Sequence, residues 1–235
     1  LLGFDVDGDG QEDDLTSEGL FIGESLGSIF DYTIDGIYQI EDEIPSGYEF
    51  GAYRVIDLNN DETIDGADRS IIGNSLPAYR WGLNSNLNYK SWSFRFFLNA
   101  VGGGKDWYLG EDTMYGFNIL NNETHFNSSF PRGIEYWTPE NPGAKYQRPG
   151  IKGAGGIAGT RYSSRDFVRL RDISLSYNFD ASSWSFIENL RLTLSGRNLL
   201  TLTNWEGWDP ETGQGITRGG RPVMQRISLG LDFTF

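Results

Sequence analysis

The chain has 235 residues, a formal net charge of −14 and no cysteine, so disulfides, thiol nucleophiles and cysteine-ligated metals are excluded. Glycine is abundant (31 residues), aromatic residues reach 14%, and hydrophobic residues make up only 38%. This combination favours many strands and turns over helices.

Residues 1–78 carry the excess acid. They hold 19 of the 33 acidic residues but only two basic ones, Arg54 and Arg69. The charge disfavours nucleic acid as a partner of this segment and favours divalent cations. Turn signals such as DGDG, DG at 35–36 and LNND predict a long folded excursion with a few short strands.

An EF-hand-like acidic loop lies near the end of this segment, with the sequence DLNNDETIDGAD. Its alternate oxygens can converge on one Ca²⁺ ion. The candidate metal ligands are Asp57, Asn59, Asp61, the Thr63 carbonyl, Asp65 and Asp68. Two departures weaken the match: Glu62 stands where the sharp turn needs glycine, and Asp68 is shorter than the usual bidentate glutamate. A calcium site and a metal-free turn held by Asx hydrogen bonds are both open.

The sequence DVDGDGQEDD supplies a second, weaker calcium candidate. Its ligands would be Asp5, Asp7, Asp9 and Asp13, with Gly10 at the turn position. Thr16 occupies the last ligand position, and no apolar residue anchors the loop. A solvated acidic loop is therefore the favoured interpretation.

From Tyr79 onward apolar and polar residues alternate with period two, which is typical of strands with two different faces. The predicted strands within 79–235 are 79–89, 91–100, 165–180, 189–200 and 224–235. The alternation assigns one set to an apolar face: Leu175, Tyr177, Leu192, Leu194, Leu229 and Leu231. It assigns a second set to the opposite face: Ser174, Ser176, Arg191, Thr193 and Ser228.

The connections between these strands alternate in length. Short turns at 90–91 and 181–188 are predicted on one side, and the long excursions 1–78, 101–164 and 201–222 on the other. Aromatic residues gather at the short-turn ends: Tyr89, Trp92, Tyr177, Phe179, Phe233 and Phe235. This pattern favours an all-β fold, the C-terminal strands of a large antiparallel transmembrane β-barrel with long extracellular loops, over a soluble β-sandwich. Five strands cannot close such a barrel, so the chain is predicted to be the C-terminal part of something larger.

Several stretches resemble the C-terminal region of SusC/RagA-type TonB-dependent transporters of Bacteroidetes outer membranes. They are GESLGSIFDYTIDGIYQ, residues 57–103, FVRLRDISLSYNF, LTLSGRNLLTLTNWEGWDPE and RISLGLDFTF. The resemblance implies a barrel of roughly 22 strands with a plugged lumen, surrounded by outer-membrane lipid. It implies import of glycans or peptides, energised by TonB through a missing N-terminal part, with a SusD-like surface lipoprotein as lid. It also implies that Phe233 and Phe235 form the signal for outer-membrane assembly.

Enzyme chemistry is not expected. The single histidine, His125, lies among Asn and Thr, so catalytic triads and histidine metal sites lack parts. Loop 101–164 offers rings that can stack on sugars or peptides, or pack against other loops: Trp107, Tyr108, Tyr115 and Phe117. Trp205 and Trp208, in WEGWDPE, are predicted to be structural. The alternative function is a secreted calcium-dependent carbohydrate-binding β-module.

Overall fold

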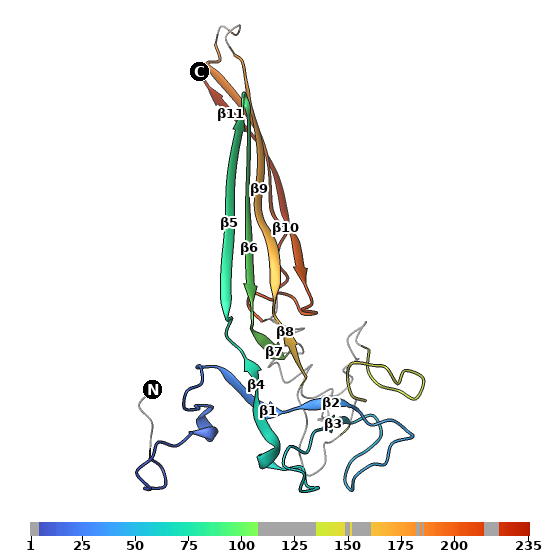
Figure 1. Cartoon of the computed structure of the whole chain (residues 1–235). Helices are drawn as coiled ribbons and strands as arrows, with labels where there is room; N and C mark the ends of the chain where they lie inside the picture. The colour runs from blue at the N-terminus through green and yellow to red at the C-terminus, as the bar shows by residue number, and fades with distance from the viewer. Residues whose placement is uncertain are drawn as a thin grey trace.

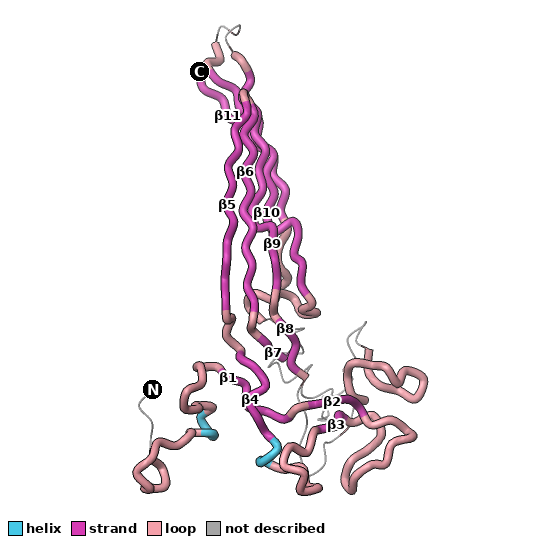
Figure 2. The backbone as a smooth tube through the Cα atoms, viewed as in Figure 1, coloured by secondary structure: helices cyan, strands magenta, loops and turns pink. Residues whose placement is uncertain are grey.

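A tall antiparallel sheet stands on a broader lobe of short strands and loops, as Figure 1 shows for the computed structural model. The structure describes residues 5–107, 135–148, 151, 161–181, 184, 186–213 and 221–235. Strands and loops make up nearly all of this part of the chain, with two one-turn 3₁₀ helices, Thr16–Glu18 and Gly66–Asp68 (Figure 2). Among the described residues no helix has the length and apolarity needed to cross a membrane.

The tall sheet has the strand order β11-β10-β9-β6-β5, with every neighbouring pair antiparallel. Its strands are β5 (Tyr79–Tyr89), β6 (Trp92–Gly102), β9 (Phe167–Phe179), β10 (Asn189–Thr203) and β11 (Arg226–Thr234). The ranges predicted for β6 and β10 end two and three residues too early, at 100 and 200. Sequence order and spatial order agree, so the sheet is an up-and-down meander whose two edges are open in the described chain.

Both short connections lie at the end of the sheet that is remote from the lobe. At Lys90-Ser91 the hairpin is tight, because Tyr89 pairs directly with Trp92 and Lys90 adopts a left-handed φ of 52°. The other short connection joins β9 to β10, and the C-terminus lies beside it (Figure 1). The lobe lies at the opposite end, which is the arrangement that the alternating connection lengths predict.

The two faces of the sheet differ in chemistry through the middle of its height. One row of paired residues crosses all five strands with apolar side chains: Leu87, Phe94, Leu175, Leu194 and Leu229. The next row on the opposite face is polar: Asn86, Arg95, Ser174, Ser195 and Ser228. Because residues paired across strands share a face, the apolar and polar sets predicted from the sequence lie on opposite faces.

Within the described residues nothing covers the apolar face. Leu194, Leu229 and Leu231 are 51%, 69% and 54% exposed. At the remote end of this face the rings of Trp92 and Tyr177 lie 4.7 Å apart, and those of Phe233 and Phe235 stack at 6.3 Å. An exposed apolar surface of this extent marks contact with a membrane or a partner.

A β-bulge interrupts the middle of the sheet and was not predicted from the sequence. Pairing of β10 with β9 shifts between Arg197 and Leu200, beside Arg171 of β9. Beyond it Leu170 pairs with Leu200, so apolar side chains continue on the same face. Bulges re-aim side chains and increase strand twist. Here the bulge separates the regular part of the tall sheet, which we call the wall, from the short lobe-side ends of β9 and β10.

The lobe is built from paired short strands. They are β1 (Ser28–Tyr32) with β4 (Arg69–Asn74), β2 (Ile34–Ile37) with β3 (Tyr53–Val55), and the connecting pair β7 (Lys105–Trp107) with β8 (Tyr162–Ser164). Ile37 and Tyr53 form one small core with Trp137, and Ile151 is fully buried in a second core with Tyr38 and Ala52. Residues from far along the chain therefore complete the core that β2 and β3 begin.

Candidate functional site

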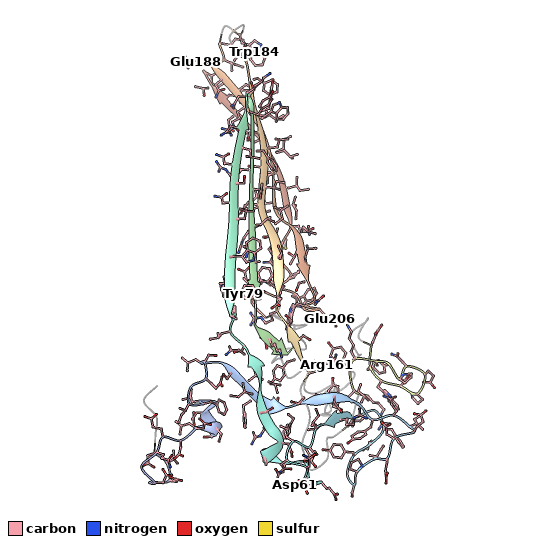
Figure 3. The ribbon with its side chains drawn as sticks, in the orientation of Figure 1. Asp61, Tyr79, Arg161, Trp184, Glu188 and Glu206 are labelled. Carbon is pink, nitrogen blue, oxygen red and sulfur yellow. The ribbon has the colours of Figure 1, made fainter. Side chains whose placement is uncertain are left out.

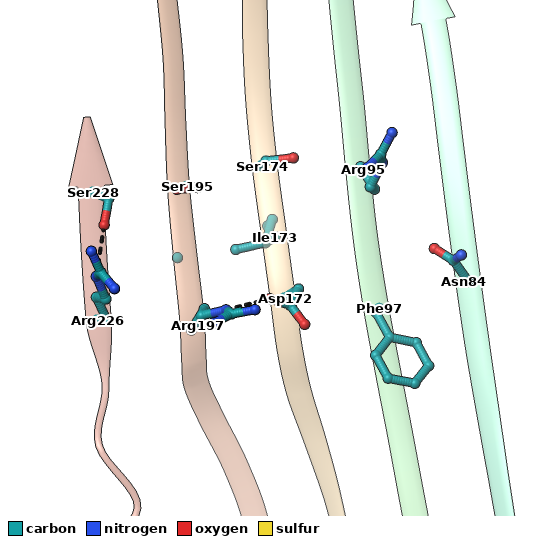
Figure 4. Close-up of a pocket in the computed structure, with 11 residues that line it drawn as sticks. Asn84, Arg95, Phe97, Asp172, Ile173, Ser174, Ser195, Arg197, Arg226 and Ser228 are labelled. Carbon is teal, nitrogen blue, oxygen red and sulfur yellow. Dashed lines mark hydrogen bonds and ion pairs between the residues drawn. The ribbon is translucent and has the colours of Figure 1, made fainter. Parts of the chain in front are cut away.

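A polar hollow lies on the polar face of the sheet, in the middle of its height. Its volume is about 740 Å³, and it is open on one side. All five strands of the sheet place guanidinium, hydroxyl, amide or carboxylate groups around it (Figure 4), and the lining side chains include Asn84, Arg95, Asp172, Ser195, Arg197 and Arg226. Strand alternation puts these groups here, because each lies on the face opposite the leucine row.

Positive charge dominates the hollow. Arg197 Nε donates to Asp172 Oδ1 at 2.9 Å, and Arg226 Nε donates to Ser228 Oγ at 3.0 Å. Within the described residues Arg95 makes no ion pair. A guanidinium has five N–H donors in a planar fork. Most donors here are therefore available, and the arrangement can bind carboxylate or other oxyanion groups.

The acidic loop at 57–68 is wound around its own side chains. Asp57 accepts the backbone N–H groups of Asn60, Asp61 and Glu62, the first and last at 2.7 and 2.8 Å. Asp61 accepts the N–H of Thr63 at 2.8 Å. These are the Asx hydrogen bonds of the metal-free alternative. They are also compatible with an ion, because each carboxylate has further lone pairs. Calcium at this loop stays a prediction.

Asp68 closes the loop. Its side chain is fully buried, and its two oxygens accept the backbone N–H groups of Leu58 and Asp65, both at 2.8 Å. Asp65 in turn caps the 3₁₀ helix by accepting the N–H of Ala67. The backbone donors, that of Asp65 first, lower the pKa of Asp68 below its usual value, although burial opposes them. Asp68 therefore joins the two ends of the loop by hydrogen bonds alone.

The charge on Asp68 predicts an acid-sensitive loop. The lowered pKa means that the folded loop favours the carboxylate, so this stabilisation is fully present above the unfolded pKa of about 3.9 and is lost as pH falls through the lowered folded value. Asp68→Asn should produce the loosened loop at neutral pH, because the amide NH₂ would face one of the two N–H donors. Hydrogen exchange at the Leu58 and Asp65 amides, corrected for intrinsic pH dependence, measures this. Equal protection in both proteins at neutral pH would contradict it.

The first acidic loop gathers its carboxylates more closely. Asp5, Asp7 and Asp13 each offer an oxygen, and these oxygens lie within 4.8 Å of one another. Asp9, the fourth predicted ligand, is not in this group and accepts the N–H of Gln11. Among the described residues only this loop brings three carboxylate oxygens that close together, and calcium at either loop stays a prediction.

Calcium titration distinguishes binding at the first acidic loop from binding at 57–68. We predict that Ca²⁺ binds with oxygen distances of about 2.3–2.6 Å, as hard cations do. Asp7→Asn should remove the contribution of the first loop, and Asp57→Asn that of the second, in isothermal titration of the purified protein. If neither substitution changes calcium uptake, both loops are metal-free turns.

The remaining predicted residues fall in three places. The backbone of Trp107 lies in β7, whereas Tyr108, Tyr115 and Phe117 lie outside the described residues. Phe233 and Phe235 lie at the end of the apolar face. Trp205 is 5% exposed, as expected of a structural residue, and Trp208 is 42% exposed.

Sequence reasoning missed a group of arginines at the lobe end of β9. Arg165, Arg169 and Arg171 all contact residues 209–211 of the WEGWDPE stretch. The signal available in the sequence was the spacing of basic residues in RDFVRLR together with an acidic DPE later in the chain.

The chain is similar to receptors of known class. It is 28% identical to TonB-dependent receptor P3 of Formosa agariphila, over 91% of the chain and 22% of that protein. It is 25% identical to TonB-dependent receptor SusC of Bacteroides thetaiotaomicron, over 77% of the chain and 17% of SusC. The chain is thus similar to TonB-dependent receptors, SusC among them. No family model matches it.

Solved structures agree on the fold. The structure of the RagAB peptide transporter matches 88% of the chain and 22% of the transporter chain, with a TM-score of 0.61 and 17% identity. The chain thus spans about a fifth of the length of the proteins it matches. That coverage, the open meander and the uncovered apolar face fit the C-terminal part of a SusC-type β-barrel, as the sequence predicts.

Proposed function

We propose that the chain forms the C-terminal part of the barrel of a TonB-dependent importer in the bacterial outer membrane. The observation that carries this proposal is the sheet itself, which has an exposed leucine face on one side and an arginine- and serine-lined face on the other. In such a barrel the leucine face contacts lipid and the polar face lines the lumen. The names of the related receptors support TonB-dependent energy coupling.

In this proposal the lobe lies outside the cell. Short turns of outer-membrane barrels face the periplasm and long loops face the exterior. The lobe and loop 204–213 therefore form the rim around the substrate entrance. We infer that this rim holds a SusD-like surface lipoprotein, and that TonB acts on a part of the receptor outside this chain.

The cargo is proposed to be an oligomeric nutrient, a glycan or a peptide. The RagAB relative is described as a peptide transporter, and the polar hollow supplies guanidinium donors that can bind carboxylates of a peptide or of an acidic sugar. Aromatic residues of loop 101–164 would add stacking surfaces. We propose a transport role and no catalytic one.

Fractionation and uptake test the proposal. The full receptor should be found in the outer-membrane fraction, should require detergent for extraction, and should bring the lipoprotein with it on purification. Cells lacking the receptor should lose TonB-dependent growth on the cognate oligomer and regain it from the intact gene. A soluble protein that needs no detergent and binds a sugar only with calcium would instead support the secreted carbohydrate-binding module.

A further inference from the structure

Arg169 is a buried cation at the end of the wall next to the lobe. Only 2% of its surface is exposed, and its guanidinium lies 4.8 Å from the centre of the Phe167 ring. Nη2 contacts Asp209 Oδ1 and Nη1 contacts Glu211 Oε2, both at 2.8 Å, and Nε donates to Thr201 Oγ1 at 3.0 Å. The fork thus joins β9 and β10 to the loop that follows β10.

Arg165 holds the same loop from a second side. Its Nε donates to the Pro210 carbonyl at 3.0 Å, and its Nη2 to the Glu211 carbonyl at 2.8 Å. Its Nη1 reaches the Ser75 carbonyl at 3.3 Å and Asp106 Oδ2 at 3.4 Å. Side chain and backbone of residues 209–211 are therefore both fixed to the wall and to the connections beside it.

The same loop also contacts the lobe through Glu206. The Glu206 carboxylate accepts hydrogen bonds from Lys145 Nζ at 2.5 Å and from the Tyr146 hydroxyl at 3.3 Å. Residues 135–148 then pack on β2 and β3, where Trp137 is 2% exposed and its Nε1 donates to Gln39 at 2.8 Å. Figure 3 shows Glu206 at the junction between the sheet and the lobe. Arg169 thus holds residues 209–211, and three residues earlier in the same loop Glu206 contacts segment 135–148, which packs on the core of the lobe.

Burying a guanidinium here costs desolvation free energy that an apolar side chain would not cost. Charges removed from water must be fully paired, and a well-packed apolar side chain often stabilises a fold as well or better. What an arginine adds is direction, because its planar fork fixes two carboxylates in one geometry. The three donors of Arg169 are each aimed at a different residue, as required of a group that sets the position of a loop.

We propose that Arg169 is the positioning residue of the rim, which holds loop 204–213 and, through Glu206, segment 135–148 in fixed register with the barrel wall. This rests on the proposed function in that it treats these segments as the rim of an importer. The rim then moves with the wall as one body, and a partner that docks on it meets a surface of constant shape.

Hydrogen exchange in the full receptor tests the proposal. Arg169→Met keeps the apolar volume and removes the fork. We expect exchange to accelerate by about tenfold or more at the Glu211 amide, which donates to Asp209, and at the Trp137 and Tyr146 amides, which donate within 135–148. Amides of the β9–β10 ladder should keep their protection. Arg169→Lys should restore part of the protection, because an ammonium reaches the carboxylates without a fork.

Arg171→Met is the matched control. Arg171 lies two residues along the strand and reaches Glu211 through one contact at 3.0 Å, with 40% of its side chain exposed. The Arg171→Met variant should leave the exchange rate of the Trp137 amide unchanged. Glu206→Gln cuts only the contacts to segment 135–148, so the Trp137 and Tyr146 amides should accelerate while the Glu211 amide does not.

Three results would overturn the proposal. They are unchanged exchange in Arg169→Met, equal acceleration throughout the β9–β10 ladder, and a Glu206→Gln protein whose segment 135–148 stays protected. If Arg169→Met does not assemble, Arg169→Lys and Glu206→Gln decide the question. None of these readouts needs transport. A receptor that shows the expected exchange and imports nothing would reject the proposed function and leave the positioning role intact.

Discussion

Arginine at position 194 is expected to destabilise the assembled barrel by roughly 2–4 kcal/mol, and arginine at position 193 by much less. Leu194 is half exposed and stands in the leucine row that crosses all five strands, near mid-height of the sheet. Thr193 is its neighbour on the opposite face, where its hydroxyl pairs with Ser176 at 3.0 Å. A guanidinium in the hydrocarbon region loses its hydration, whereas one in the lumen keeps water and polar neighbours.

Urea unfolding of the two variants in lipid vesicles gives the comparison. The two sites are adjacent in sequence and share strand, depth and backbone pairing, so the difference isolates the face. Serine at 193 serves as a control for loss of the threonine methyl group. Equal costs at the two positions would show that both faces meet the same medium, and the membrane assignment would be wrong.

The strands of the wall could be predicted from the sequence because the alternation of a two-faced strand involves only residues close together in the chain. Leu190, Leu192 and Leu194 alternate with polar residues, and no distant partner is needed to recognise that period. The bulge beside Arg171 does leave a trace in the sequence. The apolar residues of β9 fall at even positions before it (Val168, Leu170) and at odd positions after it (Ile173, Leu175), so the alternation slips by one residue although both sets lie on the same face.

The lobe was not readable in the same way. Its strands are short, and its cores are completed by Trp137 and Ile151, which follow β2 and β3 by about a hundred residues. Contacts of this kind depend on loop closure and on side-chain shape. The contacts of the arginines in β9 were not predicted for the same reason, since Arg169 and its partner Asp209 are 40 residues apart.

The acidic loops show the limit of motif reasoning. Spacing marks both loops as calcium candidates, but among the described residues only Asp5, Asp7 and Asp13 bring three carboxylate oxygens within 4.8 Å of one another. Such convergence depends on where each oxygen points. Asp68 points inward at two backbone N–H groups, whereas Asp5, Asp7 and Asp13 bring their oxygens together.

Replacing Asp57 and Asp61 together with alanine is expected to leave the barrel intact and to loosen the rim. The double change removes five hydrogen bonds that wind the loop, three accepted by Asp57 and two by Asp61. Each bond is worth about 1 kcal/mol net, less where it is exposed, so the loop should open locally. Figure 3 shows Asp61 at the end of the lobe farthest from the sheet, and no strand of the wall is touched.

Retention of the lipoprotein and uptake are the measurements. The double variant should reach the outer membrane in normal amount, should retain less of the SusD-like lipoprotein on purification, and should import more slowly, because a mobile rim presents no fixed docking surface. Calcium should strengthen retention in the parent protein, if an ion bridges the loop, and should have no effect in the variant.

Glu62→Gly is the matched control for that experiment. Glu62 has a left-handed φ of 64°, which glycine adopts without strain, and its backbone N–H still donates to Asp57 after the change. Glycine also occupies this position in EF-hand loops. This variant should therefore keep its partner and import at least as well as the parent. If the alanine double variant assembles, retains its partner and imports like Glu62→Gly, the acidic loop has no part in holding the lid.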